Sequence, residues 1–302
     1  MESTAGTFLG LKEGSLEQAQ GVILPIPYEA TTSYGKGTAQ GPAAMLAASA
    51  YVEVYDEVRD CQPALVDPFG DPETTLSRYV TVAPVVFAEP FGPAMAAIQA
   101  RAEALVRPGR VVVGIGGEHA ITPPLLAAHV RHFPDLWVLQ IDAHADLRHS
   151  YQGSIYSHAS AMARVVELVG HRLIQVGIRS ICAEDRRAMQ AARIQTFFAA
   201  GLHGKAAGDW IPEVIAGLGE HVYLTIDVDG LDPAVIPSTG TPEPGGLSWW
   251  DTIALIRALG AQRRIVGADV NELAVTGEAE ADRRSAFSVA KLTYQILAAA
   301  LP

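Results

Sequence analysis

The sequence predicts an α/β fold, a three-layer αβα sandwich with a central, mostly parallel sheet. Short runs of β-branched and other apolar residues alternate along the chain with Ala- and Leu-rich stretches of helical length. The strand-like runs are apolar throughout, which indicates burial on both faces. Alternation of such strands with helices is typical of a parallel sheet that is covered by helices on both sides.

Eight segments have the composition of strands. In chain order they are Val22–Leu24, Tyr79–Val82, Arg110–Gly114, Leu136–Ile141, Leu173–Gly177, Ile194–Phe197, His221–Ile226 and Arg264–Ala268. Seven further segments have helical length and an amphipathic or apolar character. They are Pro93–Val106, Pro123–Arg131, Ala159–Val169, Ala183–Ala191, Ile211–Leu218, Trp249–Leu259 and Ala286–Leu301. Because no stretch resembles an interdomain linker, we expect a single domain over residues 1–302, with residues 1–18 as an N-terminal arm or loop.

The composition excludes several classes of protein. With 49% hydrophobic and 18% charged residues, the chain has ample apolar surface to bury and is not disordered. A net charge of −11 argues against a nucleic-acid partner and favours a cationic small molecule. The N-terminus lacks the features of a signal peptide, and no apolar run reaches the ~20 residues of a membrane span. We therefore expect a cytoplasmic protein with no membrane partner.

Acidic residues and histidines follow four of the expected strands. They are Glu118 and His119 after the third strand, Asp142, His144 and Asp146 after the fourth, Asp227 and Asp229 after the seventh, and Asp269, Asn271 and Glu272 after the eighth. Carboxylates are rare in a protein core without compensation. Since binding sites of parallel sheets lie at the carboxyl ends of the strands, we expect these side chains to converge there.

The spacing of these residues predicts a binuclear metal site. In extended chain, residues at i, i+2 and i+4 project to one side, so the segment 142–146 would offer three ligands and the segment 227–229 two. With His119 they would form a cage of four carboxylates and two imidazoles. Carboxylates held so close would repel one another or take up protons, whereas two divalent cations balance their charge. Carboxylate and imidazole without thiolate favour manganese, iron, cobalt or nickel over structural zinc.

Each motif alone also has a simpler interpretation. The segment 142–146 could be a capped turn, the segment 227–229 a solvated turn, and the segment 116–119 a tight turn from strand to helix. A dinucleotide-binding loop at these glycines would lack its third glycine. Independent turns do not explain why six metal-ligand side chains occur at strand ends, so we favour the joint interpretation.

Four segments resemble the ureohydrolases, the arginase/agmatinase family, and most closely its agmatinase members. They read GIGGEHAITPPLL, QIDAHADLR, LTIDVDGLDPAVIPSTGTPEPGGLS and GADVNELAV, and the resemblance runs from Gly21 to Leu301. It implies an arginase-like fold, two manganese ions (Mn²⁺) per chain, hydrolysis of a guanidinium to urea, and a homo-oligomer, either trimer or hexamer. The metal ligands implied by the motifs are His119, Asp142, His144, Asp146, Asp227 and Asp229.

The resemblance also implies roles beyond the metal ligands. Glu272 matches the family's guanidinium-binding glutamate, and a carboxylate suits that planar cation. His158 matches the proton-transfer histidine, whose imidazole titrates near neutrality. In the implied reaction a metal-bridging hydroxide attacks the guanidinium carbon, while Asp146 passes a proton to the departing amine and His158 exchanges protons with solvent. Three departures from the family's motifs are Glu118 in place of Asp, Asn271 before the glutamate, and Val275 where Pro is common.

The loop after Asp146 bears on the substrate. It has no asparagine, unlike the arginases, and it resembles the agmatinase version, as does the segment 27–38. We therefore expect hydrolysis of agmatine to putrescine and urea. Arg148 could pair with a carboxylate, so 4-guanidinobutyrate and arginine remain alternative substrates, and the role of His149 in the same loop stays open.

Two other functional classes are a deacetylase-like enzyme with one zinc ion and a non-catalytic protein that only binds guanidino compounds. The complete set of six ligands argues against the first, and the retention of Glu272 argues against the second. A structural protein would leave the clustered acids unexplained. Two metal ions per chain would indicate a ureohydrolase, one a deacetylase, and none a scaffold.

Overall fold

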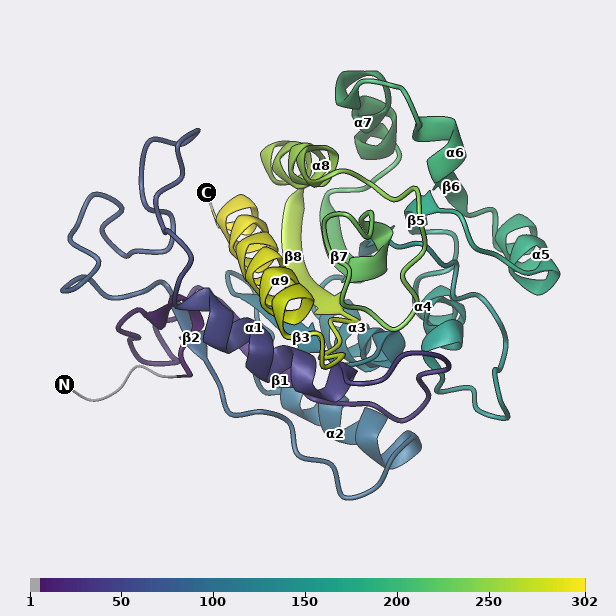
Figure 1. The fold of residues 1–302 in the computed structure, drawn as a ribbon, viewed down its shortest axis with the longest axis horizontal. Coiled ribbons are helices and arrows are strands. Elements are labelled where there is room, and N and C mark those ends of the chain that lie inside the picture. Colours follow the sequence, from purple (N-terminus) through teal and green to yellow (C-terminus); the bar gives the residue numbers. More distant parts are fainter. Residues whose placement is uncertain (1–5, 302) are drawn as a thin grey trace.

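A parallel eight-stranded sheet forms the centre of the computed structural model, which describes residues 6–301 (Figure 1). The strand order is β2-β1-β3-β8-β7-β4-β5-β6, and every neighbouring pair is parallel. The strands are β1 (Gly21–Ile26), β2 (Tyr79–Thr81), β3 (Val111–Gly116), β4 (Trp137–Ile141), β5 (Leu173–Ile178), β6 (Gln195–Phe198), β7 (His221–Asp227) and β8 (Arg264–Asn271). The predicted α/β sandwich is confirmed.

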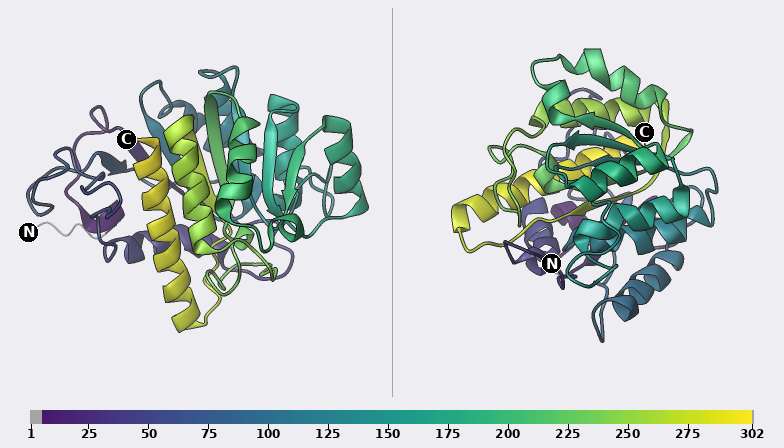
Figure 2. Two further views of the ribbon diagram at one scale, coloured as in Figure 1. Left: turned by 90° about the horizontal axis from the view of Figure 1, so that it is seen from above. Right: turned by 90° about the vertical axis from the view of Figure 1, so that its right-hand side faces the viewer.

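Helices cover both faces of this sheet (Figure 2). The helices are α1 (Gly41–Ser49), α2 (Gly92–Glu103), α3 (Thr122–Val130), α4 (Ala161–Val169), α5 (Ala183–Ala192), α6 (Ala199–Leu202), α7 (Ala207–Ala216), α8 (Trp249–Gln262) and α9 (Ala279–Ala300). Helices α1, α7, α8 and α9 pack on one face, and α2, α3, α4 and α5 on the other. Successive strand residues such as Val112 and Val113 point into opposite layers, so the continuous apolar runs serve two cores.

The helices differ from the sequence prediction at four places, one of which is the four-residue helix α6, which was not predicted. Helix α1 was not predicted, because its Ala-rich segment lacks a polar face that would mark it as amphipathic. Helix α7 begins at Ala207 and carries Pro212 within its second turn, where the sequence suggested a start at Ile211. Helix α9 begins at Ala279, seven residues before the predicted start. Its first two turns are polar and carry charges of both signs, so they lack the apolar pattern on which the prediction rested.

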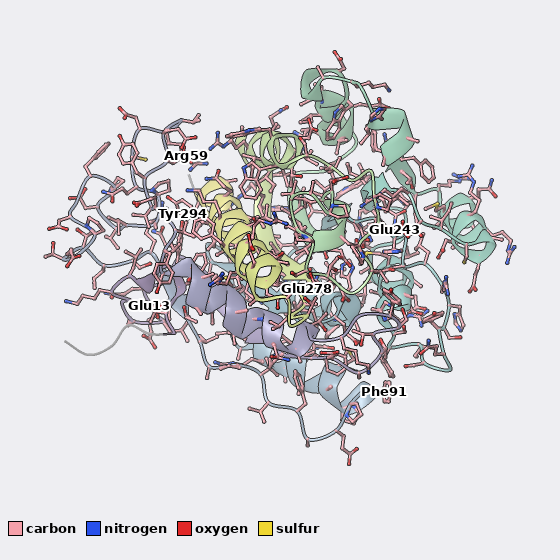
Figure 3. The ribbon with its side chains drawn as sticks, viewed as in Figure 1. Glu13, Arg59, Phe91, Glu243, Glu278 and Tyr294 are labelled. Atoms are coloured by element: carbon pink, nitrogen blue, oxygen red, sulfur yellow. The ribbon has the colours of Figure 1, made fainter. Side chains whose placement is uncertain are left out.

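The N-terminal segment packs against the domain from residue 8 onward. Phe8 and Leu9 are buried in the layer that contains α1, and the backbone nitrogen of Phe8 donates to Thr81 Oγ1 at 2.8 Å. Residues 1–5 of the predicted arm lie outside the described residues. The long loop before β2 is fixed to the same layer by the hydroxyl of Tyr294, on α9, which donates to the carbonyl of Val54 (Figure 3).

The middle of the sheet is formed by β3, β8, β7 and β4, the four strands that precede the polar clusters of the sequence. Their carboxyl ends therefore lie side by side, as a parallel sheet requires. Within residues 6–301, no helix is long and apolar enough to cross a membrane.

Candidate metal centre and active site

The six predicted metal ligands converge at the carboxyl ends of β3, β4 and β7. His119 Nδ1 lies 3.1 Å from Asp142 Oδ2, 3.2 Å from Asp146 Oδ2 and 3.7 Å from Asp227 Oδ2. His144 Nδ1 lies 3.0 Å from Asp229 Oδ2 and 3.8 Å from Asp142 Oδ1. Two overlapping groups of potential ligand atoms result, one of His119, Asp142 and Asp146 and the other of Asp142, His144 and Asp229. Asp142 belongs to both, as a residue between two metal ions would.

The predicted reason for this convergence is wrong. Residues 142–146 are not extended strand, because β4 ends at Ile141 and Asp146 has a left-handed backbone with φ of 53°. Asp229 likewise sits in a short 3₁₀ turn after β7, where its backbone nitrogen donates to Asp227 Oδ1. The side chains are thus aimed by turns at the strand ends. A non-glycine residue with positive φ is uncommon and often marks a functional position.

Two glycines allow the segment with His119 to reach the cage. A Cβ atom on Gly116 would lie 2.2 Å from Asn271 Oδ1, and one on Gly117 would lie 1.9 Å from the carbonyl oxygen of Tyr28. Only glycine permits both approaches. Close packing at the site therefore requires both glycines. This requirement explains why the segment 116–119 resembles a tight turn from strand to helix.

The hydrogen bonds around His119 leave one of its ring nitrogens free for a cation. Thr225 Oγ1 donates to Asp269 Oδ1 at 2.6 Å, so it accepts from His119 Nε2–H at 2.8 Å. His119 Nδ1 then carries a lone pair, is buried, and has no hydrogen-bond partner, although three carboxylates face it. A lone pair that faces carboxylates requires a positive charge between them, either a proton or a metal ion. One ring nitrogen held by a protein partner is also typical of metal-binding histidine.

The electrostatics of the cage point the same way. Burial and then the charges of Asp146 and Asp229 raise the pKa of Asp142 to about 7. Burial and the neighbouring aspartates also raise the pKa of Asp227 well above its usual value. Burial alone would lower the pKa of His144, but Asp229 and the other aspartates outweigh it and raise that pKa to about 10. Without metal ions, protons bound to these residues offset the repulsion between the carboxylates. Two divalent cations would offset the same repulsion, so the residues fit a binuclear metal centre.

Glu272 lies beside the cage with one carboxylate oxygen tied down. It follows β8, its φ is 67°, and its Oε1 accepts from the backbone nitrogen of His119 at 2.6 Å. Burial and the charge of Glu118 raise the pKa of the Glu272 carboxyl well above its usual value. A cationic group placed against this side chain would relieve that penalty. Asn271, the residue before Glu272, is one of the three departures from the family's motifs. It is the last residue of β8, and its Nδ2 donates to Asp269 Oδ1 at 2.6 Å.

The other two departures also have structural roles. The backbone nitrogen of Val275 donates to the carbonyl of Gly37 at 3.0 Å, a bond that Pro could not make. Glu118 Oε2 accepts from the backbone nitrogens of Ala30 and Thr31 at 2.8 and 2.6 Å, which fixes the loop after β1 over the site. Sequence reasoning missed Thr31, because its contact with Glu118 joins residues that are 87 positions apart.

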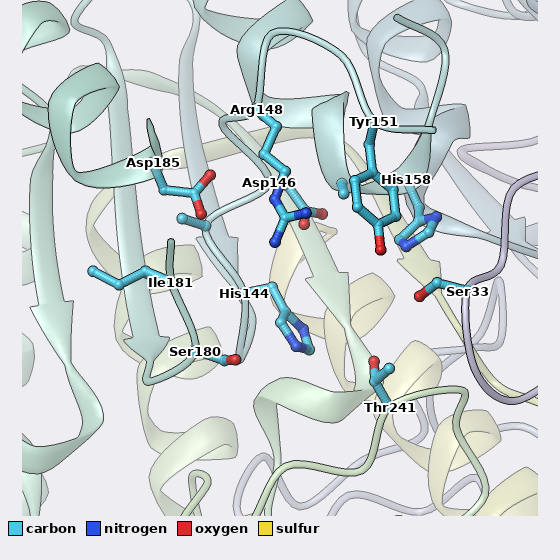
Figure 4. Close-up of a pocket in the computed structure, with 12 residues that line it drawn as sticks. Ser33, His144, Asp146, Arg148, Tyr151, His158, Ser180, Ile181, Asp185 and Thr241 are labelled. Carbon is cyan, nitrogen blue, oxygen red and sulfur yellow. The ribbon is translucent and has the colours of Figure 1, made fainter. Parts of the chain in front are cut away.

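Two connected cavities lead to these residues. The inner one, of about 20 Å³, is lined by Asp146, Asp227, Glu272 and His158, among others. The outer one, of about 200 Å³, shares His144, Asp146 and His158 with it and opens beside Arg148 and Tyr151 (Figure 4). The structure therefore brings together all eight predicted site residues. His144, Asp146, Asp227 and Glu272 line the inner cavity, His158 lines both cavities, and the other three ligands lie behind them in the cage.

Arg148 and His149 are placed differently from each other. The Arg148 guanidinium lies 4.5 Å from the centre of the Tyr151 ring and lines the outer cavity. Tyr151 also contacts the His158 ring edge-on, with 5.9 Å between ring centres. The backbone of His149 donates to Glu184 Oε1, and its side chain is exposed. One face of the Tyr151 ring is therefore occupied by Arg148.

The comparisons with known proteins agree with this geometry. The model of the arginase family matches residues 19–299. The chain is 39% identical to the N(1)-aminopropylagmatine ureohydrolase of Synechocystis sp., over 94% of this chain and 90% of that protein. It is 31% identical to the agmatinase of Bacillus anthracis, over 90% of each. The crystal structure of agmatine ureohydrolase of Thermoplasma volcanium superposes with a TM-score of 0.81 at 26% identity, covering 95% of this chain and 92% of that one.

Proposed function

The chain is a ureohydrolase of the arginase family, and from this premise we propose that it hydrolyses the guanidinium of a cationic agmatine-type compound to urea and an amine. The observation that carries this proposal is the placement of Glu272 across a narrow cavity from a cage of four carboxylates and two imidazoles. A planar guanidinium cation would fit between the Glu272 carboxylate and the metal cage, where water would be activated.

The proposed metal ligands are the six residues of the cage, His119, Asp142, His144, Asp146, Asp227 and Asp229. Their oxygen and nitrogen donors favour manganese, with two ions per chain. When bound, such ions supply Lewis acidity and lower the pKa of water so that it can attack the guanidinium carbon at neutral pH.

The remaining steps belong to side chains of the protein. Glu272 binds and orients the guanidinium through its carboxylate, most of all through Oε2, since Oε1 is held by His119 N. Asp146, which lines both cavities, accepts the proton of the attacking water and delivers it to the departing amine. His158, at the junction of the cavities, carries protons between this site and solvent. Its pKa is lowered by burial, so it is mostly neutral at pH 7 and able to accept a proton.

Agmatine and N(1)-aminopropylagmatine are the two substrates we propose for this site. Both carry amines beyond the guanidinium, and the net charge of −11 favours cations over guanidino acids. Agmatine is favoured by the loop after Asp146, which resembles that of agmatinases. N(1)-aminopropylagmatine is favoured by the 39% identity to the cyanobacterial relative, and the outer cavity offers room for a longer amine.

The test is urea release from agmatine, N(1)-aminopropylagmatine, arginine and 4-guanidinobutyrate, measured side by side with manganese-loaded protein. We expect the highest kcat/KM for one of the two amines. A higher kcat/KM for arginine or 4-guanidinobutyrate would contradict the cationic substrate, and Arg148 would then be the residue to examine. The homo-oligomeric state stays a prediction that sedimentation of the same preparation can check.

A further inference from the structure

The hydroxyl of Thr31 lies between Glu118 and His158. It donates to Glu118 Oε1 at 2.7 Å, and it lies 3.0 Å from His158 Nδ1. The backbone nitrogen of His158 also donates to Thr31 Oγ1, at 3.1 Å. A carboxylate oxygen of Glu118 and two nitrogens of His158 thus meet at the Thr31 hydroxyl oxygen, beside the junction of the two cavities.

The hydrogen-bonding capacity of the Thr31 hydroxyl determines which of these groups donate and which accept. A threonine hydroxyl has one proton to donate and two lone pairs to accept with. Its proton points to Glu118, whose other oxygen already accepts from two backbone nitrogens. One lone pair accepts from His158 N, so the other accepts from His158 Nδ1–H. In this arrangement every donor and acceptor of the hydroxyl is used once.

We infer that Glu118 and Thr31 are positioning residues that hold His158 as the Nδ1–H tautomer, with Nε2 as the nitrogen that exchanges protons in the cavity. The inference deepens the proposed function and rests on it for the proton-transfer role of His158. A ring that could flip, or that carried its proton on Nε2, could not accept a proton there without first rearranging.

The arrangement also suits a residue that changes its protonation state in every turnover. When Nε2 takes up a proton, Nδ1–H continues to donate to Thr31, and Thr31 continues to donate to Glu118. The hydrogen bonds therefore do not have to reorganise between the two states. A carboxylate behind the hydroxyl adds a favourable charge when the imidazole becomes cationic.

The length of Glu118 matters for this contact. Its carboxylate reaches the backbone nitrogens and hydroxyl of the loop after β1. An aspartate on the same backbone would end about 1.5 Å shorter, by one carbon–carbon bond. The glutamate in place of the family's usual aspartate is therefore matched to a threonine at position 31.

Kinetics of two variants of Thr31 provide the first test. Thr31→Val keeps the shape but lacks the hydroxyl, whereas Thr31→Ser keeps the hydroxyl. We expect Thr31→Val to lower kcat for urea release at least about ten-fold with little change in KM, and to shift the pH profile of kcat, while Thr31→Ser stays near the original protein. Melting temperature and bound manganese are measured for both variants, so that loss of folding or of metal is recognised.

The tautomer itself provides a second test that does not depend on activity. Nitrogen-15 spectra of the full chain, loaded with diamagnetic Zn²⁺, distinguish a protonated from an unprotonated ring nitrogen, and comparison with His158→Asn assigns the signals. We expect Nδ1–H in the original protein and in Thr31→Ser, and a mixture of tautomers in Thr31→Val.

An Nε2–H tautomer in the original protein would overturn the inference, and so would equal kcat values in the valine variant and the original protein. If the original protein released no urea from any of the four guanidino compounds, the proposed function would fail instead. The tautomer measurement would then still decide whether Glu118 and Thr31 orient His158.

Discussion

Two clusters of buried acids lie next to each other at the carboxyl ends of the central strands, and they are built in opposite ways. Asp269 on β8 accepts hydrogen bonds from Tyr223, Thr225, Asn271 and Thr122, at distances of 2.6 to 3.2 Å. These neutral donors offset part of the cost of its buried charge, although burial still raises the pKa of the Asp269 carboxyl. Its hydrogen-bond partners all belong to the protein, and its carboxylate does not face the histidines of the cage.

The aspartates of the metal cage each accept fewer hydrogen bonds from neutral donors than Asp269 does. Asp142 Oδ1 accepts from His144 N, Asp227 Oδ1 from Asp229 N, and Asp229 Oδ1 from Ala143 N. Their Oδ2 atoms face His119 or His144. Asp142 Oδ2 also accepts from Gln140 Nε2 at 2.7 Å, and Asp229 Oδ2 accepts from Thr241 Oγ1 at 3.3 Å. A backbone N–H thus orients each of these three carboxylates, and their other oxygens converge on the two histidines. The difference shows that burial of an acid does not by itself mark a functional site, whereas burial without enough donors does.

Removal of divalent cations should have the most severe consequence, because only the cage depends on them. We expect a chelator to abolish urea release and to lower the melting temperature, since four carboxylates are then left to repel one another or to bind protons. Added manganese should restore both. Metal analysis should give two ions per chain, and full activity in verified metal-free protein would rule out the binuclear centre.

Asp146→Asn should reduce turnover by about 10²-fold or more, because it removes both a metal ligand and the proposed proton acceptor. Steady-state urea release and metal content are measured together. Glu213→Gln, which neutralises an exposed carboxylate on α7, serves as the matched control. An unchanged rate in an Asp146→Asn protein that holds two metal ions would show that Asp146 is not catalytic.

Glu272→Gln should reduce kcat/KM by roughly 10- to 100-fold while both metal ions stay bound, because an amide cannot pair with a guanidinium as a carboxylate does. The variant keeps an oxygen that can accept from His119 N, so the fold should be preserved. If it lost metal and retained its KM, the assignment of Glu272 to the substrate would be wrong.

Asp269→Asn should affect stability more than chemistry. An amide at this position turns one acceptor into a donor that faces other donors, and we expect a loss of about 2 kcal/mol in the free energy of unfolding. Tyr223→Phe, which removes one of the four hydrogen bonds, should cost about 1 kcal/mol. Denaturant titrations measure both variants. If Asp269→Asn lost as much activity as Asp146→Asn and kept its stability, Asp269 would be part of the catalytic site, and the proposed difference between the two clusters would be wrong.

The sequence was sufficient to predict all eight strands and the six cage residues, because both leave local patterns. Apolar runs such as Val111–Ile115 mark buried strands, and the polar groups follow them directly. The reason for convergence was not predictable, since the left-handed backbone at Asp146 and the 3₁₀ turn at Asp229 have no signature in alternating spacing. The contact of Thr31 with Glu118 was equally hidden, because it depends on how a loop after β1 folds over the end of β3.

The order of strands in the sheet has a consequence for synthesis of the protein. The two middle strands, β8 and β7, are the last two within residues 6–301. They lie between β3 and β4, which are made earlier. A chain emerging from the ribosome therefore holds two half-sheets with open edges until β8 appears. The exposed edges of β3 and β7 would most need protection by chaperones during that interval. The metal ligands after β3 and β7 come together only when β8 has inserted between these strands, so binding of metal would follow that step.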